Sequence, residues 1–279
     1  MFRQEVSVQT KVITPPTTLL SLNIKEFWRF RELFYIFVWR DVKVRYKQTM
    51  LGIAWAVFQP LVTMLIFTVF FGNLAKIPSD GVPYPIFVYA GLLLWNYYSV
   101  ALTNISTVLV AQESIIKKVY FPRLILPLAT ALTPTIDLVF SFFVFIGLMF
   151  YFHFVPHVLG IVIMPVLIFF TFLNAAGLGL FLSSLNVKYR DVQYIVPFFI
   201  QILLFVTPVI YPVSMIPAKY TWLAWLNPMA GIITTARATL LGGPIQFWPV
   251  VFTIGLCLFL FLFGIVFFRK TERFFADIL

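Results

Sequence analysis

Few side chains in this 279-residue sequence could carry out chemistry in an otherwise apolar chain. Asp137 is the one acid well inside a long apolar segment, and a single carboxyl group cannot supply a two-group acid–base mechanism. A structural hydrogen-bonding role, or burial as the neutral protonated acid, is its simpler interpretation, because acids inside a membrane are costly and usually face a helix-bundle interior or water. His153 and His157 have a metal-ligand spacing only on a helix, and Pro156 between them breaks that geometry. The lone Cys257 excludes a disulfide framework within the chain.

The sequence contains no glycine-rich loop of the form GxxxxGK[ST], which holds nucleotide phosphates in many ATPases. The chain therefore has no recognisable ATP site of its own. Its net charge of +10 could suggest nucleic-acid binding. No basic soluble domain is present to hold a nucleic acid, so contact with anionic lipid headgroups explains the charge better.

The elements that must position any functional side chain are membrane-spanning helices. Apolar residues make up 61% of the sequence, and the mean hydropathy is +0.98. Leu51–Phe71 and Gln246–Phe268 carry no charge, and about 20 apolar residues suffice to span a bilayer as a helix. These solid runs exclude a β-barrel, which needs alternating polar residues. We expect an all-α integral membrane protein with six transmembrane helices, near residues 51–72, 86–111, 124–151, 159–185, 192–211 and 246–268.

The positive charges predict which ends of these helices share one side of the membrane. Seventeen of the twenty Lys and Arg residues fall before the first span, in two loops, or after the last span. The three exceptions are Lys76, Lys219 and Arg237. Because cytoplasmic segments carry an excess of Lys and Arg, both termini are predicted to be cytoplasmic.

The domain organisation follows from these spans. We expect a flexible cytoplasmic arm over residues 1–24, an interface helix over 25–49, a transmembrane domain over 50–268 and a cytoplasmic tail over 269–279. In the interface helix one stripe is apolar and another is cationic, which predicts an amphipathic helix lying in the inner membrane surface. The apolar stripe consists of Phe27, Phe30, Phe34, Phe37 and Val38. Membrane anchoring alone would also explain this pattern.

Two connecting segments have unusual compositions. The cytoplasmic connector Gln112–Pro127 has room for about two helical turns before Pro122, and it mixes Lys117 and Lys118 with exposed aromatic residues. It is either a docking element for a partner or a topological loop. Residues 212–245 are apolar although both of their ends lie outside, and Met229–Leu241 is too short to cross. A pair of re-entrant helices at the outer mouth of a pathway is predicted there.

Some side chains within the predicted spans remain ambiguous. Arg237, in the re-entrant hairpin, either pairs with backbone carbonyls at helix ends or lines an outer gate. Polar residues recur along the second span, where they either join helices or line a face that meets water or a polar substrate. They are Asn96, Ser99, Thr103, Asn104, Ser106 and Thr107. Trp95, Tyr97 and Tyr98 either form an interfacial belt or present flat faces to sugar rings.

Several sequence motifs together resemble a known family. The motifs are LGIAWAVFQP (Leu51–Pro60), KKVYFPR (Lys117–Arg123), LNVKYRDVQYIVPFFIQILLFVTPVIYP (Leu185–Pro212), LNPMAG (Leu226–Gly231) and FRKTERFFADIL (Phe268–Leu279). This combination resembles the membrane subunit of type-2 ABC exporters for lipid-linked polysaccharides. The group includes exporters of O-antigen, capsule and wall teichoic acid, and the resemblance covers nearly the whole chain from Lys25 onward.

The resemblance implies a permease of the bacterial inner membrane that moves an undecaprenyl-pyrophosphate-linked polysaccharide outward. It implies a homodimer that binds two copies of a cytoplasmic ABC ATPase subunit. ATP and Mg²⁺ would bind to that partner, and this chain would hold no cofactor and no metal. Its other partners would be the lipid-linked polysaccharide and membrane lipids, with no nucleic acid.

The resemblance also implies roles for individual residues. The pyrophosphate headgroup would meet Arg40, Lys43, Arg45 and Lys47. A coupling helix near residues 112–122 would dock on the ATPase through Glu113, Lys117, Lys118, Tyr120, Phe121 and Arg123. The outer gate and channel, with a gate hairpin over residues 212–245, would use Trp95, Tyr97, Tyr98, Trp222, Trp225, Asn227 and Arg237. No residue is expected to be catalytic.

Two other functions fit part of the sequence. An integral membrane glycosyl- or phosphotransferase acting on polyprenyl phosphates would need clustered acids or a metal site near the interface, and Asp137 stands apart from the other acids in the sequence. A small-solute secondary transporter would need several polar or ionisable groups inside the membrane.

Overall fold

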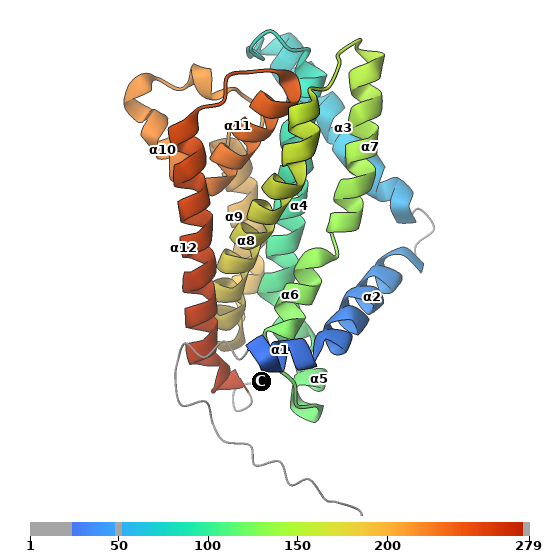
Figure 1. Ribbon diagram of the computed structural model, residues 1–279, viewed down its shortest axis with the longest axis vertical. Coiled ribbons are helices and arrows are strands. Elements are labelled where there is room, and N and C mark those ends of the chain that lie inside the picture. Colours follow the sequence, from blue (N-terminus) through green and yellow to red (C-terminus); the bar gives the residue numbers. More distant parts are fainter. Residues whose placement is uncertain (1–23, 48–51, 276–279) are drawn as a thin grey trace, which may run out of the picture.

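The computed structural model describes residues 24–47 and 52–275, and within these ranges the protein is helical, with no β-strand. The predicted flexible arm lies outside the described residues, apart from Ile24, and so does the end of the tail after Phe275. The helices form an elongated bundle with the interface helices against its lower end (Figure 1).

The predicted interface helix forms as two helices, α1 (Ile24–Arg29) and α2 (Arg31–Lys47). They lie obliquely beneath the bundle rather than along it (Figure 1). The apolar stripe is confirmed, because Phe37 is buried and its stripe neighbours pack against the same lower core. Trp28 and Trp39 are exposed on the other side.

In the described ranges, five helical segments are long and apolar enough to cross a membrane. The first joins α3 (Gly52–Phe67) to the π-helix η1 (Thr68–Leu74), and the second is α4 (Tyr84–Ala111). The third combines α6 (Ile125–Leu132) with α7 (Thr135–Tyr151), and it bends between them at Pro134.

The remaining two segments of this length are α8 (Val158–Lys188) and α12 (Phe247–Glu272). The predicted fifth of six spans is shorter than expected, since α9 covers only Val192–Val206, which is 15 residues. It ends early because Pro208 disfavours a helical conformation for the preceding Thr207.

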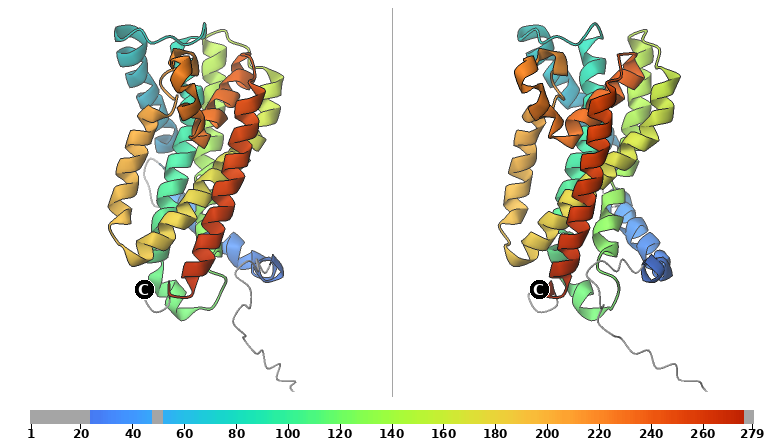
Figure 2. Two further views of the ribbon diagram at one scale, coloured as in Figure 1. Left: turned by 90° about the vertical axis from the view of Figure 1, so that its left-hand side faces the viewer. Right: turned by 60° about the vertical axis from the view of Figure 1, so that its left-hand side comes forward.

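The predicted pair of short helices precedes the last span. A run of turns with the 3₁₀ helices η2 (Val213–Met215) and η3 (Ala218–Tyr220) leads to α10 (Thr221–Trp225) and α11 (Pro228–Leu241). Both α10 and α11 lie at the upper end of the bundle (Figures 1 and 2). Asn227 caps the start of α11 by accepting a hydrogen bond from the Met229 N–H, at 3.0 Å.

Helix α4 runs through the middle of the molecule and contacts α3, α6, α7, α8, α9 and α11. The second large contact joins α8 to α12, where the two backbones approach unusually closely. A Cβ atom on Gly264 would lie 2.1 Å from the carbonyl oxygen of Gly177, so only glycine fits there.

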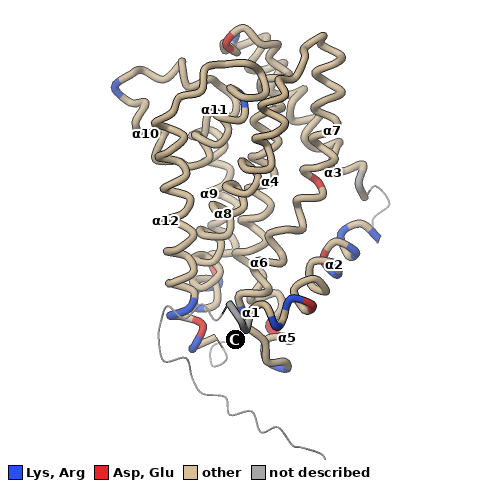
Figure 3. The backbone as a smooth tube through the Cα atoms, in the orientation of Figure 1, with Lys and Arg blue, Asp and Glu red and all other residues tan. Residues whose placement is uncertain are grey.

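Charge is distributed very unevenly along the bundle (Figure 3). Most Lys and Arg residues gather at the lower end, around α2, the connector helix α5 (Glu113–Lys118) and the end of α12 (Figure 3). The predicted grouping of the cationic segments at one end of the bundle is therefore confirmed.

Candidate functional site

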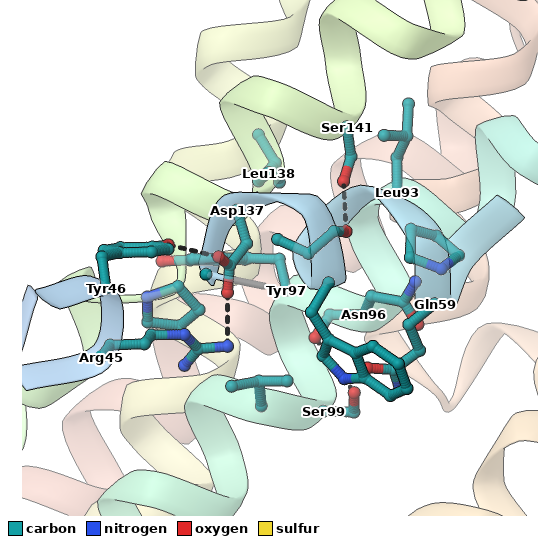
Figure 4. Close-up of a pocket in the computed structure, with 16 residues that line it drawn as sticks. Arg45, Tyr46, Gln59, Leu93, Asn96, Tyr97, Ser99, Asp137, Leu138 and Ser141 are labelled. Carbon is teal, nitrogen blue, oxygen red and sulfur yellow. Dashed lines mark hydrogen bonds and ion pairs between the residues drawn. The ribbon is translucent and has the colours of Figure 1, made fainter. Parts of the chain in front are cut away.

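A cavity of about 510 Å³ lies between the end of α2 and the helices α3, α4 and α7. Figure 4 shows its polar side chains in two groups, with charged residues at one end and amide and hydroxyl residues at the other. The charged group is Arg45, Tyr46 and Asp137. The amide and hydroxyl group consists of Gln59 from α3, Asn96 and Ser99 from α4, and Ser141 from α7.

Asp137 joins the interface helix to the third span. It lies in the first turn of α7, directly after the bend at Pro134, where the end of α2 can reach it. Its carboxylate forms an ion pair with Arg45 and accepts a hydrogen bond from the Tyr46 hydroxyl (Figure 4). The prediction of a structural hydrogen-bonding role is confirmed, although Asp137 is not isolated from charged partners.

The environment of Tyr46 keeps its phenol protonated. Burial raises the pKa of the Tyr46 hydroxyl above its usual value, and the hydrogen bond to Asp137 and that residue's negative charge raise it further. The positive charge of Arg45 acts in the opposite direction. The hydroxyl therefore remains a hydrogen-bond donor to the carboxylate.

Arg40 is also held by residues of this chain. Its guanidinium pairs with Asp41 at 2.8 Å, lies 5.0 Å from the centre of the Phe37 ring, and donates to the Gln112 side chain at 3.4 Å. Asp41 in turn accepts a hydrogen bond from Thr130 of α6, at 3.3 Å. Arg40 therefore helps to fix α2 to the bundle.

The four cations predicted for a pyrophosphate headgroup thus fall into two classes. Arg40 and Arg45 are partly buried, and each forms an ion pair with an acidic residue of this chain. Lys43 and Lys47 are exposed, and within the described part of the chain neither forms an ion pair. The role of all four in binding a headgroup stays a prediction.

The amide end of the cavity is polar but incompletely bonded. Ser99 donates to the Asn96 carbonyl oxygen at 3.0 Å, and Ser141 donates to the Ala56 carbonyl oxygen at 3.4 Å. The side-chain amides of Gln59 and Asn96 have no hydrogen-bond partner among the residues that the structure describes. The polar pattern of the second span pointed to Asn96 and Ser99, whereas no sequence signal had pointed to Gln59.

The connector Gln112–Pro127, predicted to be cytoplasmic, is only partly exposed. Lys117 pairs with Glu113 at 2.6 Å, and this hydrogen bond and charge hold the pKa of the Glu113 carboxyl below its usual value. Lys118 and Tyr120 are exposed, with Tyr120 62% accessible. Phe121 was predicted to be exposed for docking, but it is only 4% accessible.

The burial of Phe121 has a physical reason. Pro122 turns the chain back toward the bundle, and the Phe121 ring enters the lower core, with its centre 5.6 Å from that of Phe37. Arg123, also predicted for docking, donates to the Glu272 carbonyl oxygen at the end of α12. These two residues attach the connector to the bundle instead of projecting from it.

Arg237 is buried at the opposite end of the bundle. Its guanidinium donates to the backbone oxygens of Phe87 at 3.0 Å, Pro208 at 2.6 Å and Val209. The predicted pairing with backbone carbonyls is therefore confirmed. Arg237 also lines a second cavity, of about 840 Å³, together with residues 212–218 and the loop 75–83 between η1 and α4, which the predicted topology makes the first outer loop.

The aromatic residues predicted for the outer gate occupy different environments. Trp95, Tyr97 and Tyr98 are buried, with only 2–3% of each residue accessible, so the prediction of an interfacial belt is wrong. These side chains are buried because α4 packs against α3, α6, α7, α8, α9 and α11. Only Tyr97 of these three contacts the first cavity. Trp222 is exposed, and Trp225 is half-buried.

The two histidines do not form a metal site. His153 has a left-handed backbone conformation, with φ of 54°, after the end of α7, and His157 precedes α8. Within residues 24–47 and 52–275, no group of three or more His, Cys, Asp or Glu side chains is placed to hold a metal ion.

Comparison with known proteins gives the family. Residues 32–241 match the ABC-2 type transporter family. The chain is 27% identical over 248 residues to the O-antigen export system permease protein RfbA of Klebsiella pneumoniae. The aligned residues cover 89% of this chain and 95% of that protein. It is 29% identical over 219 residues to the RfbA of Myxococcus xanthus, covering 77% and 82% of the two chains.

A more distant similarity is to the polysialic acid transport protein KpsM of Escherichia coli, at 21% identity over 212 residues, or 74% of this chain and 80% of that protein. The family match spans well over half of the chain. It includes the connector, α11 and the cavity of about 510 Å³ next to α2, which we call the inner cavity. The chain therefore belongs to the ABC-2 type transporter family, as a membrane permease subunit.

Proposed function

We propose that this permease moves an undecaprenyl-pyrophosphate-linked polysaccharide of the O-antigen kind outward across the bacterial inner membrane, driven by ATP hydrolysis on its partner. In this family the ATPase lies in a separate subunit, and the permease itself carries no cofactor. The names of the relatives, two O-antigen export permeases and a polysialic acid transporter, support a polysaccharide as the cargo.

One structural observation in this chain supports the proposal. The exposed cations Lys43 and Lys47 lie in the last turns of α2, the same segment that contributes Arg45 to the lining of a polar cavity. Cations at this level would attract the phosphates of a lipid headgroup in the inner leaflet. Arg45 could contribute a bidentate contact if it exchanged Asp137 for a phosphate.

The proposed topology has six spans with both termini in the cytoplasm. The span that is added to the five long ones is α9, the fifth in chain order, whose 15 residues rise about 22 Å, less than the roughly 30 Å of hydrocarbon. The residues that follow it are buried and bonded by Arg237, so non-helical backbone can complete the crossing inside protein.

The proposed assembly is a homodimer with two ATPase subunits, which bind ATP and Mg²⁺. The connector helix α5 would dock on the ATPase through its exposed side chains, Lys118 and Tyr120 above all. At the other end, α10 and α11 would form the outer gate, with Trp222 and Trp225 near the exit and Asn227 fixing the start of α11.

The headgroup proposal is tested by replacing both exposed lysines, Lys43→Ala with Lys47→Ala. Each cation near an anionic membrane surface contributes about 1 kcal/mol, so we expect the loss of two to lower export at low substrate concentration about 30-fold. The readout is polysaccharide delivered to the outer face per unit of permease in the membrane. Lys219→Ala, at the opposite end of the bundle, is the matched control.

Unchanged export in the double variant, with normal membrane levels, would show that these lysines serve only orientation. A membrane transferase is a weaker explanation for the same residues. Its best candidate acid, Asp137, is held by Arg45 and Tyr46 rather than paired with a second carboxyl group.

A further inference from the structure

The inner cavity has an unusual property for its depth in the membrane. Gln59 lies on the first span and Asn96 near the middle of α4, and their amide groups have no protein partner among the described residues. A polar group that faces hydrocarbon without a hydrogen bond costs several kcal/mol. In this chain these amides are open to water or to a hydroxylated ligand that enters the cavity.

The chemistry of the cavity favours a neutral ligand over an anion. The single positive charge in its lining, Arg45, is matched by the single negative charge, Asp137. The other end offers amides and hydroxyls, which both donate and accept hydrogen bonds, as sugar hydroxyls do. Trp55, which is 53% accessible, adds a flat aromatic face to the same wall.

The size of the cavity also fits such a ligand. Its volume of about 510 Å³ falls in the range of sites for small organic molecules and far exceeds the roughly 30 Å³ of one water. Convergent polar groups beside an aromatic wall are typical of specific ligand sites.

We propose that this cavity binds the sugar residue next to the pyrophosphate of the lipid-linked cargo, through the amides of Gln59 and Asn96. The inference rests on the proposed function, because it places the pyrophosphate outside the cavity on the exposed lysines of α2. It adds a recognition site for the first sugar, which would let the permease distinguish a glycosylated carrier from an empty one.

The test compares two soluble probes on the full-length protein in lipid nanodiscs. One probe is farnesyl pyrophosphate, and the other is the same compound carrying N-acetylglucosamine on its terminal phosphate. We expect the wild type to bind the sugar-bearing probe about tenfold more tightly, which is the contribution of one or two good hydrogen bonds. The readout is the ratio of the two dissociation constants.

Gln59→Leu replaces an exposed side chain and should reduce this ratio to about twofold or less, since the sugar loses a hydrogen-bond partner. Asn96→Leu provides a second, independent variant on α4. Asn73→Leu is the matched control for Gln59→Leu. Asn73 is exposed in η1, at the other end of the first span, and it lines neither cavity. It should keep the wild-type ratio.

Equal binding of both probes by the wild type would overturn the inference while leaving the headgroup site intact. A ratio that survives in both leucine variants would do the same. If neither probe binds to the wild type, the headgroup site of the proposed function fails, and the sugar site fails with it.

Discussion

At the scale of single residues, three arginines of this permease link separate elements of the fold. Arg45 joins α2 to α7 through Asp137, and Arg123 joins the connector to α12. Arg237 holds the turn after α9 against the start of α4. An arginine can serve in this way because its five donors bond several oxygens at once. Lys43 and Lys47 on α2 and Lys118 on α5 remain exposed.

Two adjacent residues of the connector should separate docking from stability. Phe121→Ala removes a buried ring and should lower the free energy of unfolding by about 3–5 kcal/mol. Tyr120→Ala removes an exposed ring and should leave stability within about 0.5 kcal/mol. If Tyr120 contacts the ATPase, its variant should still lower permease-stimulated ATP hydrolysis. Thermal unfolding of the purified permease and ATPase rates of the reconstituted complex provide the two measurements.

The opposite pattern would contradict this division of roles. A Phe121→Ala protein with wild-type stability would mean that the ring is not packed in the lower core. A Tyr120→Ala complex with full ATPase stimulation and full export would remove Tyr120 from the docking surface.

At the scale of elements, breaks in the helices determine where the functional side chains lie. The bend between α6 and α7 brings the first turn of α7 within reach of α2. The early end of α9 creates the turn that Arg237 bonds. The tight contact of α8 with α12 has a different basis, since it depends on the absence of side chains at Gly177 and Gly264.

Substitutions at two glycines of α12, Gly264 and Gly255, test the contact between α8 and α12. Gly264→Ala would place its Cβ atom 2.1 Å from the Gly177 carbonyl oxygen, so the two helices must separate. Overpacking of this kind typically costs about 1–3 kcal/mol. Gly255→Ala lies on the same helix with no neighbouring atom within 4 Å, and the change should be neutral or slightly stabilising. The measurement is the midpoint of thermal unfolding for each variant in the same detergent, and equal midpoints would refute the close contact.

At the scale of the whole molecule, the bundle has a cationic end and an outer end, each with a cavity. The cavity near α2 is lined by α3, α4 and α7, and the one near α11 is lined by the first outer loop and residues 212–218. This arrangement suits a cargo that is recognised at one membrane surface and released at the other.

Much of this architecture was predictable from the sequence. The apolar runs predicted the long helices, the Phe27–Val38 stripe predicted the buried face of the interface helices, and the short run Met229–Leu241 coincides with most of α11. Such features depend on local spacing and on the turn preferences of single residues. The resemblance to exporter permeases also led to the right family.

The cavity was not predictable in the same way. Arg45 and Asp137 are 92 residues apart in the sequence, and Gln59 meets Asn96 only because α3 packs on α4. No local pattern encodes these pairings. The direction of Phe121 also depends on the lower core that receives it, so the connector's composition alone suggested an exposed ring.

The central claim is that this chain exports a lipid-linked polysaccharide with energy from a separate ATPase. It is tested most directly by reconstituting the permease with its ATPase partner in liposomes that contain such a polysaccharide, and by following its appearance on the opposite face with an impermeant lectin. We predict ATP-dependent translocation by the complex, and none by the permease alone or with an ATPase that lacks its nucleotide-binding lysine. Translocation that is independent of the ATPase, or no translocation by a complex that hydrolyses ATP, would contradict the claim.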